Sequence, residues 1–159
     1  MSQKRWGVWQ DSVEVETEFD QIKAFVKFAW KWQVDFFTPE LRHFLNQDLQ
    51  KTFDFVVSKY TLEDGEQILR PLYFAQIGSD CDDGLIFWLS LMMASHYPLK
   101  DLMIVEVKES PKDDYYCHVF AALRLGKKII YLDNLPGSRF GVVDYEDDQM
   151  RMRPASRFL

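Results

Sequence analysis

The chain has 159 residues, a formal net charge of -6 and only two cysteines. A chain of this length forms one domain that buries roughly two thirds of the surface of its unfolded state, so it needs no disulfide or metal to fold. The acidic balance and the lack of a strong basic run argue against nucleic acid as a partner, because phosphate neutralisation supplies most non-specific affinity. Residues 1–10 contain no apolar signal segment, and no apolar run approaches the ~18 residues of a membrane span. We therefore expect a cytoplasmic protein without a membrane partner.

Two helices are predicted in the first half of the chain. Residues 1–16 show little periodicity, and we expect them to form an irregular arm that buries Trp6 and Trp9 against the body. Apolar residues then recur at intervals of three and four over residues 17–34, which predicts an amphipathic helix. A threonine followed by proline is a helix start signal, and it opens a second helical pattern over residues 38–60.

A third helix is predicted at the centre of the chain. Residues 71–74 have the character of an extended apolar piece, which leads into the acidic, glycine-flanked loop 78–84. The residues that follow are almost all apolar, so we expect residues 82–96 to form a helix that is buried on all sides. Cys81 lies where this helix begins.

The thiol of Cys81 is the candidate nucleophile. At a helix N-terminus the unpaired backbone N–H groups and the helix dipole favour negative charge, which lowers the pKa of a cysteine from about 8.5. Asp82 and Asp83 act in the opposite direction, because carboxylates beside the sulfur disfavour a second anion. The thiol therefore needs a cationic partner from elsewhere in the chain.

The second half of the chain has the pattern of strands. Branched and alternating apolar runs cover residues 102–107, 116–125 and 128–132. Because the helices come first and the strands follow, this order indicates an α+β fold. Gly126 fits the first central position of a two-residue hairpin turn between the last two strands.

This hairpin is expected to bring a histidine and a carboxylate together. When Leu125 pairs with Lys128, Phe120 lies opposite Asp133. His118 is then the diagonal neighbour of Asp133 on the same face, roughly 7 to 8 Å away. In nucleophilic catalysis such a carboxylate orients the imidazole, and the other ring nitrogen addresses the nucleophile. A register slip of one residue would place the two side chains on opposite faces.

The second cysteine is expected on the other face of the same strand. Alternation separates Cys117 from its neighbour His118, so Cys117 points away from Cys81 when His118 faces it. This argues against a disulfide between the two cysteines. We therefore predict that Cys117 is a small buried hydrophobic side chain.

The whole chain, residues 1–159, is expected to be a single domain with three parts. These parts are an N-terminal arm with helices over residues 1–67, a core over residues 68–145 and a tail over residues 146–159. The acidic patch at residues 144–148 and the arginines that follow it are expected to be solvated surface.

The residues around these three side chains resemble those of the transglutaminase-like and papain-like cysteine protease superfamily, and especially its bacterial and phage transglutaminase-like cysteine proteinases. The similar pieces are Gly-Ser-Asp-Cys-Asp-Asp at a helix start, Tyr-Cys-His-Val-Phe on a strand and Tyr-Leu-Asp on the next strand, within residues 68–141. Ser79 is inserted into the family's Gly-Asp-Cys sequence. An Asn-Leu-Pro-Gly run replaces the more common aspartate-proline continuation.

The resemblance implies a function and a fold. It implies Cys81 as nucleophile, His118 as general base and acid, and Asp133 as the orienting carboxylate. Gln76 is similar to the glutamine that precedes the cysteine in papain-like enzymes and helps to bind the oxyanion, while the backbone N–H of Cys81 is a second donor. The fold it implies is a central helix packed on a small antiparallel sheet. It further implies a protein or peptide substrate, with hydrolysis and acyl transfer both open, and no cofactor.

Two alternatives remain at this point. One is a catalytically inactive transglutaminase-like module with a binding or structural role, in a phage or prophage setting. The crowding of carboxylates beside the thiol fits that reading. The other is a metal site made of Asp80, Cys81, Asp82 and His118, which adjacent residues disfavour because they cannot all point inward.

Overall fold

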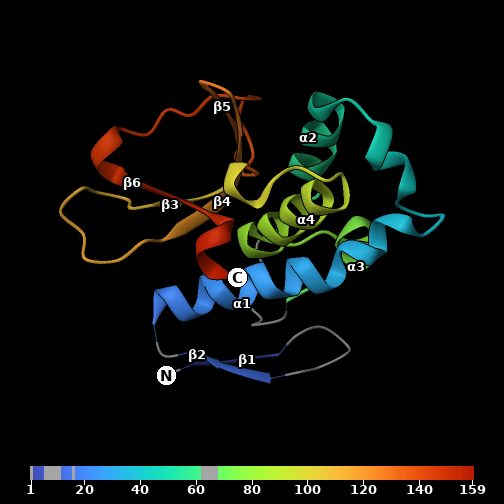
Figure 1. Cartoon of the computed structure of the whole chain (residues 1–159). Coiled ribbons are helices and arrows are strands. Elements are labelled where there is room, and N and C mark those ends of the chain that lie inside the picture. The colour runs from blue at the N-terminus through green and yellow to red at the C-terminus, as the bar shows by residue number, and fades with distance from the viewer. Residues whose placement is uncertain (1, 6–11, 16, 62–67) are drawn as a thin grey trace.

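The computed structural model describes residues 2–5, 12–15, 17–61 and 68–159. In these residues the chain combines four α-helices with a four-stranded antiparallel sheet, which confirms the predicted α+β class. Figure 1 shows α4 in the middle of the molecule, with α1 below it and the sheet to its left. Among the described residues, no helix has the length and apolar character needed to cross a membrane.

The helices and strands have the following bounds. The α-helices are α1 (Glu18–Trp32), α2 (Leu49–Ser58), α3 (Pro71–Ile77) and α4 (Cys81–Ala94). The 3-10 helices are η2 (Gln33–Phe37), η3 (Arg42–Asn46), η4 (Leu99–Asp101), η5 (Asp147–Gln149) and η6 (Ala155–Phe158). The strands are β1 (Ser2–Arg5), β2 (Ser12–Val15), β3 (Leu102–Val107), β4 (His118–Leu125), β5 (Lys128–Leu132) and β6 (Met150–Pro154).

The N-terminal arm is more regular than its sequence suggests. β1 and β2 form an antiparallel ladder in which Ser2 lies opposite Val15 and Arg5 lies opposite Ser12. The prediction of an irregular arm is therefore wrong for these residues. Trp6 and Trp9, which were expected to be buried, lie outside the described residues.

The first predicted helix is confirmed, and the second is not. The Thr17 side chain accepts a hydrogen bond from the backbone N–H of Asp20 and caps α1. Thr38 does not begin a helix, because its hydroxyl donates to the carbonyl oxygen of Asp35 at 2.6 Å and so closes the preceding turn. The regular helix α2 begins only after Asp48, which accepts from the backbone N–H of Gln50 at 2.8 Å.

Helix α3 occupies the segment that was predicted to be extended. Its first residue is Pro71, whose fixed backbone angle suits the first helical position. The buried carboxylate of Asp35 accepts from the backbone N–H of Leu72 at 3.1 Å and is paired with the Arg70 guanidinium. This carboxylate comes from a segment more than thirty positions earlier, so the local pattern could not show it.

The central helix and the hairpin follow their predictions. All residues of α4 from Asp83 to its end are buried. Leu125 pairs with Lys128, and the register runs on to Ala121 opposite Leu132, as the two-residue turn requires. Helix α4 lies against one face of the sheet, while Tyr145 from the segment after β5 packs on the other face.

The end of the chain is part of the fold rather than a surface tail. β6 pairs with β3 and completes the sheet in the order β5-β4-β3-β6. The carboxylate of Glu106 on β3 is buried and pairs with both arginines of β6. It contacts Arg151 at 2.8 Å and also contacts Arg153. Phe158 in η6 is buried and its ring packs 4.9 Å from that of Phe19 on α1.

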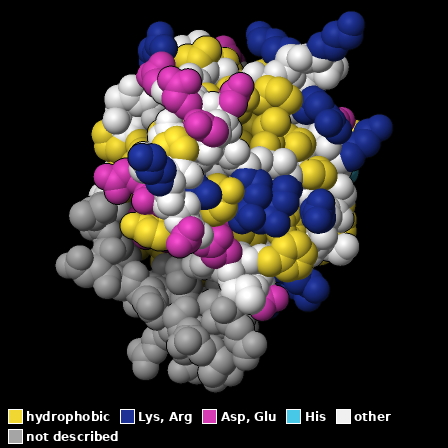
Figure 2. All heavy atoms as spheres, turned by 90° about the vertical axis from the view of Figure 1, so that its left-hand side faces the viewer, with side chains coloured by type: hydrophobic (Ala, Val, Ile, Leu, Met, Phe, Trp, Pro, Cys, Tyr) yellow, Lys and Arg dark blue, Asp and Glu magenta, His cyan; other side chains and the backbone are white. Residues whose placement is uncertain are grey.

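Charged side chains are unevenly distributed on the outside. On the face shown in Figure 2, Lys and Arg side chains gather toward the right and Asp and Glu side chains toward the left. Part of this face is therefore basic, although the net charge of the chain is negative.

Candidate active site

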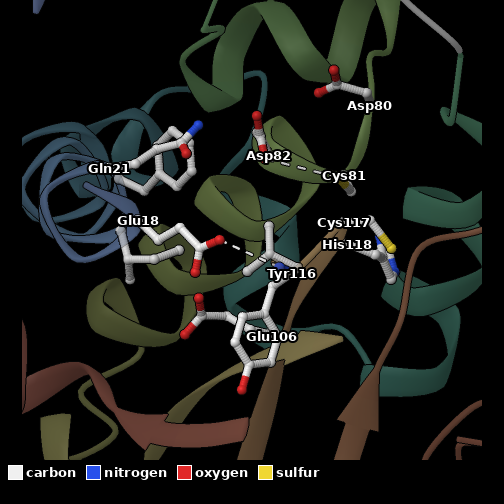
Figure 3. A pocket seen from close by; sticks show the side chains of 12 residues that line it. Glu18, Gln21, Asp80, Cys81, Asp82, Glu106, Tyr116, Cys117 and His118 are labelled. Atoms are coloured by element: carbon white, nitrogen blue, oxygen red, sulfur yellow. Dashed lines mark hydrogen bonds between the residues drawn. The ribbon is translucent and has the colours of Figure 1, made fainter. Parts of the chain in front are cut away.

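A cavity of about 320 Å³ brings together α1, the start of α4 and the start of β4. Figure 3 shows Glu18 and Gln21 on one side of this cavity and Cys81, Cys117 and His118 on the other. The backbone N–H of Tyr116 donates to Glu18 and fastens the residues before β4 to α1. Two of the three predicted catalytic residues thus line one cavity.

Cys81 is the first residue of α4, and its preceding loop is anchored by backbone contacts. The N–H of Ser79 donates to the carbonyl oxygen of Lys59, and the N–H of Thr61 donates to that of Ser79, both at 3.0 Å. Gly78 adopts a φ of 74°, and a Cβ at this position would lie 2.3 Å from the Lys59 oxygen. Ser79 is therefore a buried part of the loop that these backbone contacts hold in place.

The surroundings of the Cys81 sulfur favour the neutral thiol. Burial raises the pKa of Cys81 strongly, and the Asp82 carboxylate, whose Oδ1 lies 3.8 Å from Sγ, raises it further. A hydrogen bond from the backbone of Val119 acts in the opposite direction and is the weaker influence. The helix start therefore does not produce the lowered pKa that its dipole suggested, because desolvation exceeds that effect.

His118 and Asp133 form the predicted pair. His118 Nε2 lies 2.7 Å from Asp133 Oδ1, across the hairpin and on the same face of the sheet. Both side chains are largely buried, and the backbone N–H of Leu135 also donates to Oδ1. Because Nε2 is engaged by the carboxylate, Nδ1 is the ring nitrogen that can exchange a proton with another group in the cavity.

Comparison of the chain with protein-family models, curated proteins and solved structures finds no match. The chemistry of the site is therefore taken from its own side chains. A thiol at a helix start and an imidazole held by a carboxylate line the same region, which is the set of groups needed for nucleophilic attack with proton transfer. In the described part of the chain, no cluster of three or more His, Cys, Asp or Glu side chains is arranged to hold a metal ion.

Tyr145 contacts the His118–Asp133 pair of the candidate site, and the sequence did not reveal it. Its phenol donates to Asp133 Oδ2 at 3.0 Å, so each carboxylate oxygen has a partner. Burial and the Asp133 charge raise the pKa of Tyr145, which keeps its proton in place to donate. No periodic pattern marks this residue, since it lies in the irregular segment after β5.

Tyr60 is a second residue that was not predicted. It follows α2 and forms an isolated parallel bridge with Ser79, two residues before Cys81. Burial raises the pKa of its phenol, and the charges of Cys81, Asp80 and Asp133 raise it further. The phenol therefore lies within electrostatic reach of both halves of the site.

Gln76 is not brought to the site. It is exposed near the end of α3 and lines a different cavity, of about 230 Å³, together with Phe44 and Leu72. The resemblance placed it at the oxyanion because of its distance from Cys81 in sequence. That distance is taken up by the last turn of α3 and the bend at Gly78, so the amide stays on the outer side of the helix.

Cys117 is exposed, and the prediction that it is a buried hydrophobic side chain is wrong. β4 begins at His118, so the strict alternation that was assumed does not extend back to Cys117. Its backbone N–H and its thiol both donate to the carbonyl oxygen of Val107, and the residue lines the same cavity as Cys81. Both cysteines are free thiols, as predicted.

Proposed function

We propose that the chain is a cysteine-dependent hydrolase or acyltransferase that acts on amide or peptide bonds, with a transglutaminase-like or papain-like core. The observation that carries this proposal is the 2.7 Å contact between His118 Nε2 and Asp133 Oδ1 beside the cavity of Cys81. The contact orients the imidazole, and the proposal assigns Nδ1 to the thiol because Cys81 and His118 line the same cavity. A helix packed on an antiparallel sheet, with the cysteine at the helix start, also supports it.

In the proposed reaction, His118 moves the proton. Nδ1 takes the proton from Sγ as the sulfur attacks the acyl carbon, and negative charge develops on the acyl oxygen. In this proposal the N–H groups at the start of α4, including that of Cys81, stabilise this oxygen. The imidazolium then gives its proton to the leaving amine, which produces a thioester. Water or a second amine attacks the thioester and gives a proton to His118. The carbon–sulfur bond then breaks, and the imidazolium returns the proton to the departing sulfur, which restores the thiol.

The raised pKa of Cys81 affects the first step. Because the thiol is neutral before reaction, its proton leaves for His118 as the carbon–sulfur bond forms. The carboxylate of Asp133 stabilises the imidazolium that this step creates. The dependence on His118 should therefore be large, since little thiolate exists without it.

The test uses an electrophile and a substrate library on the same variants. In a Cys117→Ser background, one equivalent of iodoacetamide should label Cys81, and His118→Ala should slow labelling by about 100-fold. A library of acyl and peptide substrates should be turned over by the background protein and not by Cys81→Ala. If Cys81 reacts like an unstructured thiol and His118→Ala leaves its rate unchanged, the enzyme proposal fails.

A second candidate is an inactive binding or structural module with the same fold, in a phage or prophage setting. The strongly raised pKa of Cys81 and the carboxylates of Asp80, Asp82 and Asp83 around it support this candidate. It predicts slow labelling of Cys81 that does not depend on His118. The experiment above therefore distinguishes the two candidates.

A further inference from the structure

Asn134 joins the two halves of the proposed site. It is the residue next to Asp133, and it is 1% exposed. Its side-chain Nδ2 donates to the carbonyl oxygen of Asp80, the residue before Cys81, at 3.3 Å. Two consecutive residues thus contact the histidine on one side and the nucleophile loop on the other.

The carbonyl oxygen of Asp80 has a second donor that ties it to the helix. The backbone N–H of Gly84 donates to it at 3.1 Å, which is the first hydrogen bond of α4. Asn134 therefore holds the turn of backbone that carries Cys81. A shift of this side chain would move the helix start relative to β5.

Gly84 leaves the space that this contact requires. A Cβ at position 84 would lie 2.2 Å from Asn134 Nδ2 and 2.9 Å from its Cγ. Gly84 has an ordinary helical backbone and needs no unusual angle. Glycine weakens a helix interior. At position 84 the missing side chain leaves room for the amide of Asn134.

The other polar atom of the same side chain supports a special role. Asn134 Oδ1 is buried and finds no hydrogen-bond partner among the described residues. An unsatisfied buried oxygen is unfavourable, and an apolar side chain of similar size would avoid it. The amide is therefore explained by what Nδ2 holds, and not by general packing.

From these contacts we infer that Asn134 is a positioning residue that fixes Cys81 relative to the His118–Asp133 pair. The dipeptide 133–134 acts as a rigid link, because one residue is bound to the imidazole and the next to the helix start. The inference rests on the proposed function in one respect, which is that a proton passes between Cys81 and His118.

The test is a double-mutant cycle on the labelling of Cys81 by iodoacetamide. All proteins carry Cys117→Ser, and the variants are Asn134→Ala, His118→Ala and the two combined. Asn134→Ala should slow labelling by roughly 10- to 100-fold, as a misplaced reacting group does. It should have no further effect when His118→Ala is already present, because both changes remove the same interaction. Asn46→Ala, at an exposed position in η3, is the matched control and should leave the rate unchanged.

A second variant approaches the same contact from the other side. Gly84→Ala should slow labelling to a similar extent, because the added methyl displaces the amide. In the Asn134→Ala background, Gly84→Ala should cause little further loss, since the clash is gone. A structural role would instead lower the melting temperature in proportion and leave the effects of Asn134→Ala and His118→Ala additive.

The outcomes separate this inference from the proposed function. If His118→Ala itself has no effect, the proposed function fails. If His118→Ala slows labelling while Asn134→Ala does not, or does so additively, the positioning role is overturned and the proposed function stands. Asn134→Ser replaces Asn134→Ala if the latter is unfolded at the labelling temperature. Loss of folding in both variants would also overturn the positioning role.

Discussion

At the scale of a single residue, two opposing effects act on the pKa of Cys81. The helix start and the backbone of Val119 favour the thiolate, whereas burial and the Asp82 carboxylate favour the thiol. Burial has the larger effect, so the fold favours the neutral thiol. The sequence could locate the cysteine at a helix start, but it could not show how deeply the fold encloses it.

This balance predicts an unusual pH dependence for Cys81. Its pKa is raised above the ordinary value of 9.0, so the thiolate fraction in the folded protein is lower than in an unstructured thiol at every pH. Labelling by iodoacetamide in the Cys117→Ser, His118→Ala protein should still be rising above about pH 10. The same protein unfolded in urea should reach half its maximal rate near pH 9 and level off about one pH unit higher. Coincident curves would contradict the raised pKa.

Tyr145 is predicted to strengthen the orienting carboxylate. Tyr145→Phe removes the 3.0 Å hydrogen bond to Asp133 Oδ2, and bonds to charged groups contribute about 1.5–3 kcal/mol. We expect the rate of Cys81 labelling or substrate turnover to fall about tenfold. Tyr115→Phe is the control, because Tyr115 is exposed and near the same sheet, and it should have no effect.

Asp83 is predicted to destabilise the folded protein at neutral pH. Burial raises the pKa of Asp83 well above 3.8, although the backbone N–H of Leu69 donates to Oδ1 at 2.8 Å. The folded state therefore binds its proton more tightly than the unfolded state, and stability is lost as pH rises from about 4. The free energy of unfolding of Asp83→Asn should therefore increase, relative to that of the unsubstituted chain, as the pH rises from about 4 to 7. Urea unfolding of both proteins at pH 4 and pH 7 measures this change. If the difference between their free energies of unfolding is the same at the two pH values, the prediction is wrong.

The central helix and the β4–β5 hairpin could be predicted from local signals, whereas α3 and β6, which depend on distant partners, could not. The hairpin of β4 and β5 has a glycine turn and alternating side chains, so its register and the pairing of His118 with Asp133 could be derived. Helix α3 depends on the carboxylate of Asp35 from an earlier segment. β6 alternates methionine with arginine, and these charges resemble surface until Glu106 is seen to pair with them.

Glu106 is predicted to hold β6 against β3. Its side chain is 3% exposed, and Glu106→Gln would leave Arg153 without a carboxylate and Arg151 with only its 3.5 Å contact to Glu18. We expect the free energy of unfolding to fall by about 3 kcal/mol, as for other broken buried pairs. Glu109→Gln, at an exposed position just after β3, should change it by less than about 0.5 kcal/mol. Equal effects of the two variants would contradict this role.

At the scale of the whole molecule, the C-terminal segment closes the core. Figure 1 shows the C-terminus beside α1, where η6 meets the helix. The site depends on this closure indirectly, because α1 supplies one side of its cavity. A sequence pattern of four residues cannot show such a contact, since Phe19 on α1, which packs on Phe158, is far away in the chain.

Phe158 is therefore predicted to matter far more than the residue beside it. Phe158→Ala removes a ring that is 1% exposed, and we expect the free energy of unfolding to fall by about 3 kcal/mol. Leu159→Ala, at a position that is 49% exposed, should have an effect within about 0.5 kcal/mol. Urea unfolding of both variants gives the comparison, and similar losses would contradict closure by η6.

The hairpin also determines the order in which the site can assemble during folding. His118 and Asp133 are only 15 positions apart and joined by a tight turn, and hairpins form in about 1–10 μs. Cys81 joins them only when α4 packs against β4, which requires slower non-local contacts. A refolding chain should thus expose a freely reactive thiol until the helix docks. The disappearance of that reactivity would time the formation of the core.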